Sequence, residues 1–243
     1  MGAFAGPADW WTDGTNDGRT HIATKGVVQS GLVLNLDTGV SSSYPGSGTT
    51  WTDLSGQGNT GTLTNGPTYS SSNGGSLIFD GVDDYILTST INHNIGTGDF
   101  SYTVWFYATS LRAVGATLCA FIGNGDYSPT FGFDLNNYSN QLGFYWMGWR
   151  GFGSVPSLNQ WNYGVMTRTS GIISGYLNGN ICPTTYNVNF SMSNSQNVIG
   201  RSGVNYAPDV FKGNIAQVSI YNRALTASEI QQNFNALRGR FGL

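Results

Sequence analysis

Acidic side chains are the first place to look for chemistry in this chain, because hydrolysis of a glycosidic bond needs two carboxyl groups that flank it. The 13 acidic residues include a single glutamate, Glu229. It follows Thr226 at the spacing of a helix capping box, which already gives it a structural role. The other acids are aspartates that stand mostly beside Gly, Asn or Ser, where Asp caps the backbone amides of turns. This inventory excludes a glutamate-pair mechanism and predicts a protein that is not an enzyme.

Metal ligands are equally sparse. The histidines, His21 and His93, stand apart in loop-like sequence, and isolated histidines do not make a zinc site. Asp83 and Asp84 are adjacent, and adjacent residues of a strand point to opposite faces, so they are not expected to converge on one ion. We therefore predict no metal site, although these two carboxylates leave calcium open as a cofactor.

Aromatic side chains are the better candidates, because sugars are held by aromatic faces and a few fixed polar groups. In the run 144–150, read as a strand, Tyr145, Met147 and Trp149 share one side, and the other aromatics share the opposite side. One set is expected in the core and the other on the surface. Together with Tyr127 from a nearby loop, Tyr145 and Trp149 are the predicted carbohydrate-binding residues. The alternative is that these aromatics simply fill the core.

Composition narrows the class of protein. The chain has 10 basic residues and a net charge of −3, which gives no basic stripe for nucleic acid. Aromatic residues make up 14%, which argues against disorder. No run approaches the roughly 20 apolar residues of a membrane span. The cysteines, Cys119 and Cys182, are too few for a disulfide framework and are expected to be reduced, with one bridge left open.

The secondary-structure signals are those of many short strands. Alternating or aromatic runs are separated by turns rich in the 35 glycines, which predicts an all-β sandwich. The run 100–108 is apolar on both sides and is expected to be a central strand covered on both faces. Asn178 and Gly179 predict a two-residue hairpin turn. The predicted strands are 32–37, 76–79, 85–88, 100–108, 117–122, 131–135, 142–149, 163–168, 172–177, 197–199 and 214–221.

One helix is predicted near the C-terminus. Thr226 is its N-cap, and Ile230, Phe234 and Leu237 form one apolar stripe at helical spacing. Gly239 is the expected stop. The helix should therefore pack on the sandwich through that stripe.

Residues 1–30 differ from the rest and are interpreted as an arm, which leaves 31–243 as the sandwich domain. Exposed tandem tryptophans are costly, so Trp10 and Trp11 are expected either to pack back on the sandwich or to dock on a partner. The start has neither a basic region nor an apolar run, so no secretory signal peptide is predicted.

Four stretches, taken in order, resemble the laminin-G-like, concanavalin A-like lectin/glucanase superfamily. They are 75–85, 99–106, 161–179 and 213–225 with the helix that follows. The opening segments 31–37 and 44–56 are similar to the versions found in bacteriophage virion proteins. The resemblance implies a jelly roll of two antiparallel sheets packed face to face, with the short C-terminal helix and the N-terminal arm attached. Many relatives carry an acidic pair where this chain has Ala216 and Gln217, which weakens a calcium site that relies on those carboxylates.

The resemblance also implies a setting. We expect a non-catalytic structural protein of a phage virion, such as a capsid decoration, fibre or tail-associated subunit, assembled in the host cytoplasm. It would be present as a homo-oligomer or in many copies, would contact other virion proteins through the arm, and would display the sandwich toward host-surface glycans. No contact with nucleic acid or membrane is expected. The alternatives are a stand-alone carbohydrate-binding module and, third, a glycoside hydrolase that works with aspartates.

Overall fold

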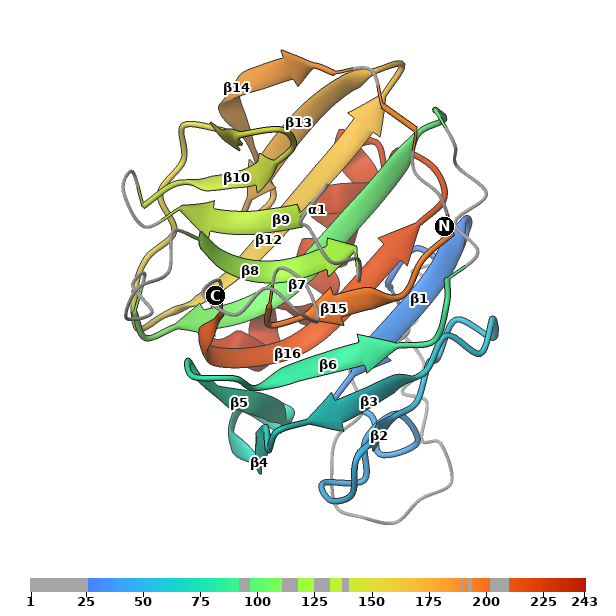
Figure 1. Ribbon diagram of the computed structural model, residues 1–243, viewed down its shortest axis with the longest axis vertical. Helices are drawn as coiled ribbons and strands as arrows, with labels where there is room; N and C mark the ends of the chain where they lie inside the picture. Colours follow the sequence, from blue (N-terminus) through green and yellow to red (C-terminus); the bar gives the residue numbers. More distant parts are fainter. Residues whose placement is uncertain are drawn as a thin grey trace, which may run out of the picture.

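The computed structural model describes residues 26–91, 97–110, 118–124, 132–136, 140–188, 190–191, 194–201 and 210–243. In these residues the chain forms two antiparallel sheets packed face to face (Figure 1). One helix lies on the outer side of the sheet that is called the back sheet below. The predicted all-β sandwich is confirmed.

The back sheet is the one that carries the helix. Its strands, in order across the sheet, are β14 (Asn180–Asn187), β13 (Ile172–Leu177), β12 (Trp161–Thr169), β7 (Phe100–Ala108), β16 (Lys212–Tyr221), β5 (Ser76–Asp80) and β4 (Thr68–Ser70), and β1 (Leu32–Asp37) also pairs with β16. Its central strand β7 is buried along nearly its whole length, because its inner side chains enter the core and its outer ones lie under the helix. The expectation of a strand covered on both faces is confirmed.

The front sheet faces the other way. Its strands, in order, are β11 (Trp149–Gly151), β10 (Leu142–Tyr145), β9 (Gly132–Asn136), β8 (Leu118–Asn124), β15 (Asn197–Ile199), β6 (Tyr85–Thr88), β3 (Gly61–Thr64) and β2 (Thr50–Trp51). The short strands β2, β3 and β4 were not predicted, because their two to four residues are mostly Gly, Thr and Ser and carry little apolar alternation.

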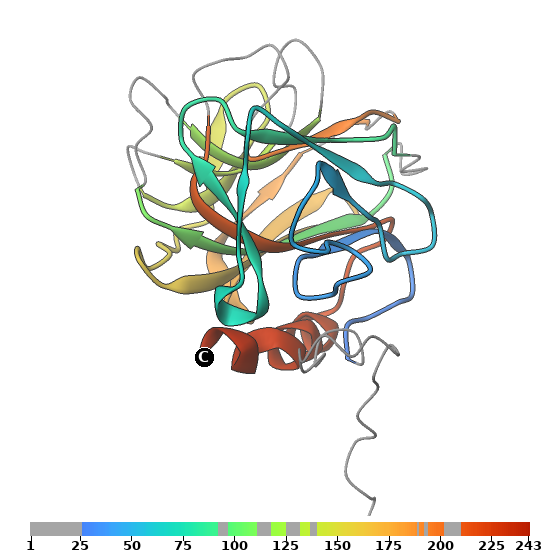
Figure 2. The same cartoon turned by 90° about the horizontal axis from the view of Figure 1, so that it is seen from below.

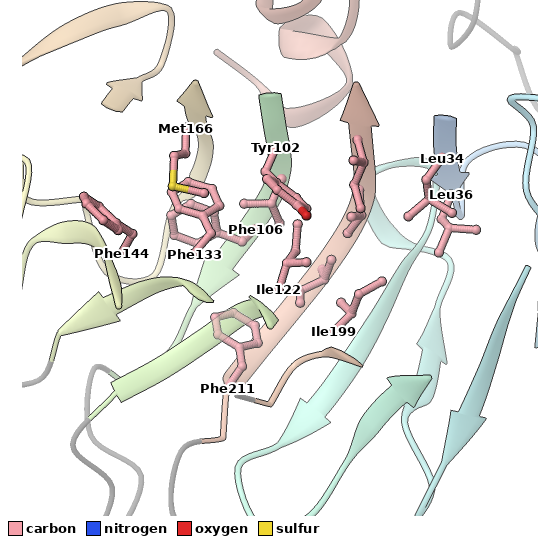
Figure 3. Packing of buried hydrophobic residues seen from close by; sticks show 14 of the residues in the cluster. Leu34, Leu36, Tyr102, Phe106, Ile122, Phe133, Phe144, Met166, Ile199 and Phe211 are labelled. Carbon is pink, nitrogen blue, oxygen red and sulfur yellow. The ribbon is translucent and has the colours of Figure 1, made fainter. Parts of the chain in front are cut away.

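The main core fills the space between the sheets. Figure 3 shows aromatic and aliphatic side chains from both sheets pointing toward one another. Phe133 and Phe144 come from the front sheet, and Tyr102, Phe106 and Met166 come from the back sheet. All five are at most 1% exposed. At about 25 cal/mol per Å² of buried apolar surface, this layer supplies most of the free energy that holds the sheets together.

The helix α1 (Ala227–Leu237) and the 3-10 turn η2 (Arg238–Phe241) lie against the outer face of the back sheet (Figure 2). A second hydrophobic cluster fills the space beneath them. Trp105 lies at its centre and is fully buried. Its ring stacks on Phe234 at 5.7 Å, Phe241 at 4.4 Å and Tyr163 at 5.0 Å between centroids. The predicted apolar stripe of the helix is thus the side that meets the sheet.

The start of the helix follows the prediction. Thr226 is the N-cap, and the reciprocal capping box with Glu229 is present. The α-helix ends at Leu237, two residues before the predicted stop at Gly239. The chain then continues through η2, which contains Gly239, and the left-handed residue is Gly242, whose φ is 73°. Buried Phe241 stabilises this extra turn.

Arg240 fixes the C-terminal turn to the first strands. Its Nη1 donates to Asp37 at 2.6 Å, in a pair whose carboxylate is 1% exposed, and Nη2 donates to the carbonyl oxygen of Gly75 at 2.6 Å. Removing one partner of a buried ion pair leaves an uncompensated charge. The ion pair joins two segments that lie about 200 residues apart in the sequence.

Two further predictions concern turns. Asn178 and Gly179 have φ of 51° and 81° and join β13 to β14, which confirms the hairpin. The predicted strand 142–149 is wrong, because Met147 (φ 47°) and Gly148 (φ 132°) reverse the chain and split it into β10 and β11. Cys182, in β14, is a free and buried thiol.

Only the end of the predicted arm can be described. Val27 and Val28 are buried in the outer cluster, and the amide of Val28 donates to the side chain of Asn233 in α1 at 2.8 Å. Trp10 and Trp11 lie outside the described residues. The described part of the chain contains no helix that is both long and apolar enough to span a membrane.

Candidate functional site

The outer faces of the two sheets differ in what covers them. On the back sheet, α1 and η2 bury the aromatic side chains. On the front sheet, Tyr145 and Trp149 are partly exposed. They lie directly opposite each other in the β10–β11 hairpin. This pair of aromatic side chains is the candidate site.

Two glycines form the bed on which Trp149 lies. Gly143 and Gly151 are paired across β10 and β11. A Cβ added to Gly151 would lie 2.6 Å from Cζ3 of the Trp149 ring, and a Cβ added to Gly143 would lie 2.8 Å from its Cζ2. The indole therefore lies across bare backbone in space that side chains would otherwise take.

Packing, rather than a hydrogen bond, holds the indole in place. Its Nε1 is buried and has no hydrogen-bond partner among the described residues. An unsatisfied buried donor costs roughly 1–3 kcal/mol, so the close fit over the glycines has to offset that loss. The arrangement gives a fixed, partly exposed aromatic surface at the edge of the front sheet.

The turn beside this surface is braced from several directions. Nη1 of Arg150 donates to the carbonyl oxygens of both Trp146 and Gly148, and the amide of Trp146 donates to Gly148 at 3.0 Å. The Trp146 ring stacks on Phe190 at 4.4 Å with 24° between the planes. Met147, at the tip, is 85% exposed. The turn is thus anchored on the core side and presents one apolar side chain to solvent.

A carboxylate on the same face was missed by the sequence analysis. Asp134 in β9 pairs with Gly143 and is fully buried. Its oxygens lie 3.0 Å from the position a Cβ would take at Gly132, so a side chain at residue 132 would crowd the carboxylate. The signal was available, because Asp134 alternates with buried Phe133 and Leu135 and must therefore point away from the core.

Two of the three predicted carbohydrate-binding residues are therefore brought together. The sequence placed Tyr145, Met147 and Trp149 on one side of a continuous strand, whereas the structure brings Tyr145 and Trp149 together across a hairpin. Phe144 belongs to the core, as one of the two predicted arrangements required. Tyr127 lies outside the described residues, as do His21 and His93.

Three carboxylates gather at the turn between β5 and β6. Ligand oxygens of Asp80, Asp83 and Asp84 all lie within 4.8 Å of one another. The argument that Asp83 and Asp84 point apart is wrong here, because the two residues belong to a turn and strand alternation does not apply. Carboxylate oxygens at one point suit a hard cation such as calcium, so this is where the described part of the chain could hold one.

Burial of Asp84 shifts its titration. Loss of hydration raises its pKa to about 6; a hydrogen bond from the Asp80 amide opposes this, and the charges of Asp80 and Asp83 add to it.

The closing-strand positions 216 and 217 supply no carboxylate to a cation site. Ala216 is buried under the helix, and Gln217 bonds Asn35 and Ser219 at 3.1 Å each.

The carboxylate of the single glutamate is used in the hydrogen bonds of the helix cap. Glu229 accepts from Arg223 at 2.7 Å and 2.9 Å and from the amide of Thr226 at 2.9 Å. The hydrogen bonds from Arg223, the largest cause, hold its pKa down at about 2. At neutral pH it is a fixed anion in a helix cap.

Comparison with solved structures identifies the architecture. The fourth domain of AbnA, an extracellular GH43 arabinanase from Geobacillus stearothermophilus in complex with arabinotriose, matches at a TM-score of 0.63 and 18% identity over 85% of this chain and 98% of that one. Trypanosoma rangeli sialidase with 2,3-difluorosialic acid matches at 0.63 and 18% identity over 84% of this chain. This chain spans only 33% of the length of that sialidase.

Sequence comparison supplies the family. No curated protein matches the chain. The family model described as the concanavalin A-like lectin/glucanases superfamily, Laminin_G_3, matches residues 80–231, which is more than half of the 243 residues. The chain therefore belongs to the laminin-G branch of the concanavalin A-like lectin/glucanase superfamily.

Proposed function

We propose that this protein is a non-catalytic lectin-like subunit that binds glycans with the outer face of its front sheet, and that it is displayed on a phage virion. The observation that carries the binding proposal is the Trp149 indole, laid across Gly143 and Gly151 and partly exposed. Aromatic rings stack on the apolar faces of sugars, and a ring held in advance loses little entropy on binding. Tyr145 and Tyr127 are the proposed neighbours in this site.

The absence of catalysis is part of the proposal. The one glutamate of the chain is held by Arg223 in the helix cap. Among the described aspartates, Asp37 is paired with Arg240, and Asp53 accepts backbone amides of its own loop and of Asn35. The described carboxylates that remain include Asp134 on the face of the candidate site and the cluster at the β5–β6 turn, and we propose that they serve structure or a cation. A glycoside hydrolase needs two carboxyl groups that flank one bond. Incubation with a broad polysaccharide panel should therefore release no reducing sugar.

The binding test is a comparison of Trp149→Ala with the wild type on a glycan array, followed by titration calorimetry on each hit. The array should include arabinotriose, the sugar bound to the arabinanase domain of the same fold. Loss of one stacked ring corresponds to roughly 1.5–3 kcal/mol, so we expect the affinity to fall by about 10- to 100-fold. Trp149 is partly exposed, so the free energy of unfolding should change by no more than about 1 kcal/mol.

The matched control is Ile181→Ala, which removes an exposed apolar side chain from the edge strand β14 of the back sheet. Its glycan affinity should equal that of the wild type. Equal affinity of Trp149→Ala and the wild type would reject the site, and no binding by the wild type would reject the lectin function.

The virion setting needs a separate experiment. Gold-labelled antibody against the sandwich should mark intact phage particles at regular capsid positions or at the tail. Deletion of residues 1–25, which leaves the packed Val27 and Val28 in place, should abolish attachment to the particle while the sandwich stays folded. Trp10→Ala with Trp11→Ala should have the same effect if these side chains dock on a virion protein. Unlabelled particles with an accessible epitope would favour the stand-alone carbohydrate-binding module.

A further inference from the structure

Met147 has a positive φ, a backbone conformation that the described residues otherwise reserve for Gly, Asn and Ser170. Among the described residues, the non-glycine positions with positive φ are five asparagines and Ser170, together with Met147. Asn tolerates the left-handed region because its short side chain can bond locally, whereas a long side chain there is strained. The asparagines are Asn65, Asn73, Asn140, Asn159 and Asn178. Position 147 is therefore the exception, although Asn or Gly would suit the backbone better.

The strain is imposed by a turn that is built to be rigid. Arg150 bonds both carbonyls that flank Met147, and the stacking of Trp146 on Phe190 holds the turn to the core side. Strained residues persist where the surrounding structure over-determines them, and they cluster at sites of function. The structure thus holds an apolar side chain out in solvent at a fixed position.

The position of Met147 says what it can contact. It stands at the tip of the β10–β11 hairpin, two residues from Tyr145 on one side and two from Trp149 on the other. It is 85% exposed, and a Cβ on the next residue, Gly148, would meet no atom within 4 Å. A flexible, polarisable thioether adapts to irregular apolar surfaces. Met147 is therefore an exposed apolar side chain at the tip of the same hairpin that carries the Trp149 ring.

The geometry points to a site with two subsites, in which Trp149 stacks on one sugar ring and Met147 packs against the next. The ligand class is then an oligosaccharide rather than a monosaccharide. This inference rests on the proposed glycan function of the same face, and it adds Met147 as the residue that sets the preference for chain length.

The test uses the wild type and the variants Met147→Asn and Trp149→Ala with a size series of each sugar found on the array, from the monosaccharide to the tetrasaccharide. Wild-type affinity should rise by about 5- to 10-fold from one sugar to two, as expected for one additional apolar contact. Met147→Asn should lose that rise and keep the monosaccharide affinity. Trp149→Ala should weaken every member of the series.

Met147→Asn is also its own folding control. Asn suits the left-handed conformation, so the melting temperature of the variant should equal or exceed that of the wild type. A wild type that binds every length with equal affinity, or a Met147→Asn variant that keeps the rise, would overturn the two-subsite inference and leave the glycan function standing. A wild type that binds no member of the series would overturn both.

Discussion

The two sheets each carry a tryptophan on the outer face, and the comparison between them separates structure from function. Trp105 on the back sheet is fully buried between Phe234, Phe241 and Tyr163. Trp149 on the front sheet lies over glycines and stays partly exposed. In both, Nε1 is buried without a hydrogen-bond partner among the described residues. What differs is the cover, because among the described residues it is the outer face of the back sheet that lies under the C-terminal helix (Figure 2).

An aromatic side chain on a sheet face is therefore not evidence of function until it is known what covers it. Trp105 contributes apolar burial that a ligand cannot use. Trp149 has one side packed on backbone and stays partly exposed, so a ligand can reach part of the ring.

The largest effect is expected at the covered tryptophan. Trp105→Ala removes a fully buried ring from the centre of the outer cluster and should lower the free energy of unfolding by about 3–5 kcal/mol. Urea denaturation followed by circular dichroism measures it. A loss below about 1 kcal/mol would mean that the helix does not cover this face in solution, and the two faces would no longer differ.

An intermediate effect is expected at the turn that joins the two sheets. The pKa of Asp84 is raised to about 6 from an ordinary value near 4, so between these values the folded state binds more protons than the unfolded state. Stability should therefore fall as pH rises from about 4 to above 6, by roughly 1–3 kcal/mol. Asp84→Asn, which is neutral at every pH, should remove this decline and be more stable than the wild type at pH 7. Thermal denaturation across the pH range measures both.

The control for this turn is Asp99→Asn, a change of the same chemistry away from the cluster, which should keep the decline. Added calcium at pH 7 should raise the melting temperature of the wild type and of Asp99→Asn, and should not raise that of Asp84→Asn. A wild type insensitive to calcium would show that the three carboxylates do not form a cation site.

The smallest effect on stability, with a large one on binding, is expected at the glycine bed. Gly151→Ala places a methyl group where the Trp149 ring and the side chain of Gln141 lie, so it should displace the indole at a cost of about 1–2 kcal/mol. Glycan affinity should fall by about tenfold or more, although residue 151 itself offers the ligand no side chain. Gly239→Ala, where a Cβ meets no atom within 4 Å, is the matched control: it should leave glycan affinity unchanged and should not lower stability, since Ala is favoured over Gly in a helical turn. Unchanged affinity of Gly151→Ala would show that the position of the indole does not matter.

Local features of the sequence predicted most of the architecture correctly. The alternation at Leu32, Leu34 and Leu36 gave a strand, and the spacing of Thr226 and Glu229 gave the capped start of the helix. These features depend on neighbours within a few residues, where geometry is set by backbone periodicity and local hydrogen bonds. The prediction of one strand over 142–149 was wrong for the same reason. It rested on the local pattern alone, and a methionine such as Met147 does not indicate a left-handed turn.

The fold class, the helix cap and the aromatic composition of the hairpin follow from local features of the sequence. Long-range packing decides which tryptophan is covered, that Gly143 and Gly151 form the bed of Trp149, and that three aspartates meet at one turn. It also decided that Arg240 reaches Asp37. These outcomes depend on contacts between segments far apart in the chain, and local propensity carries no information about which distant surface will come to lie against a given face.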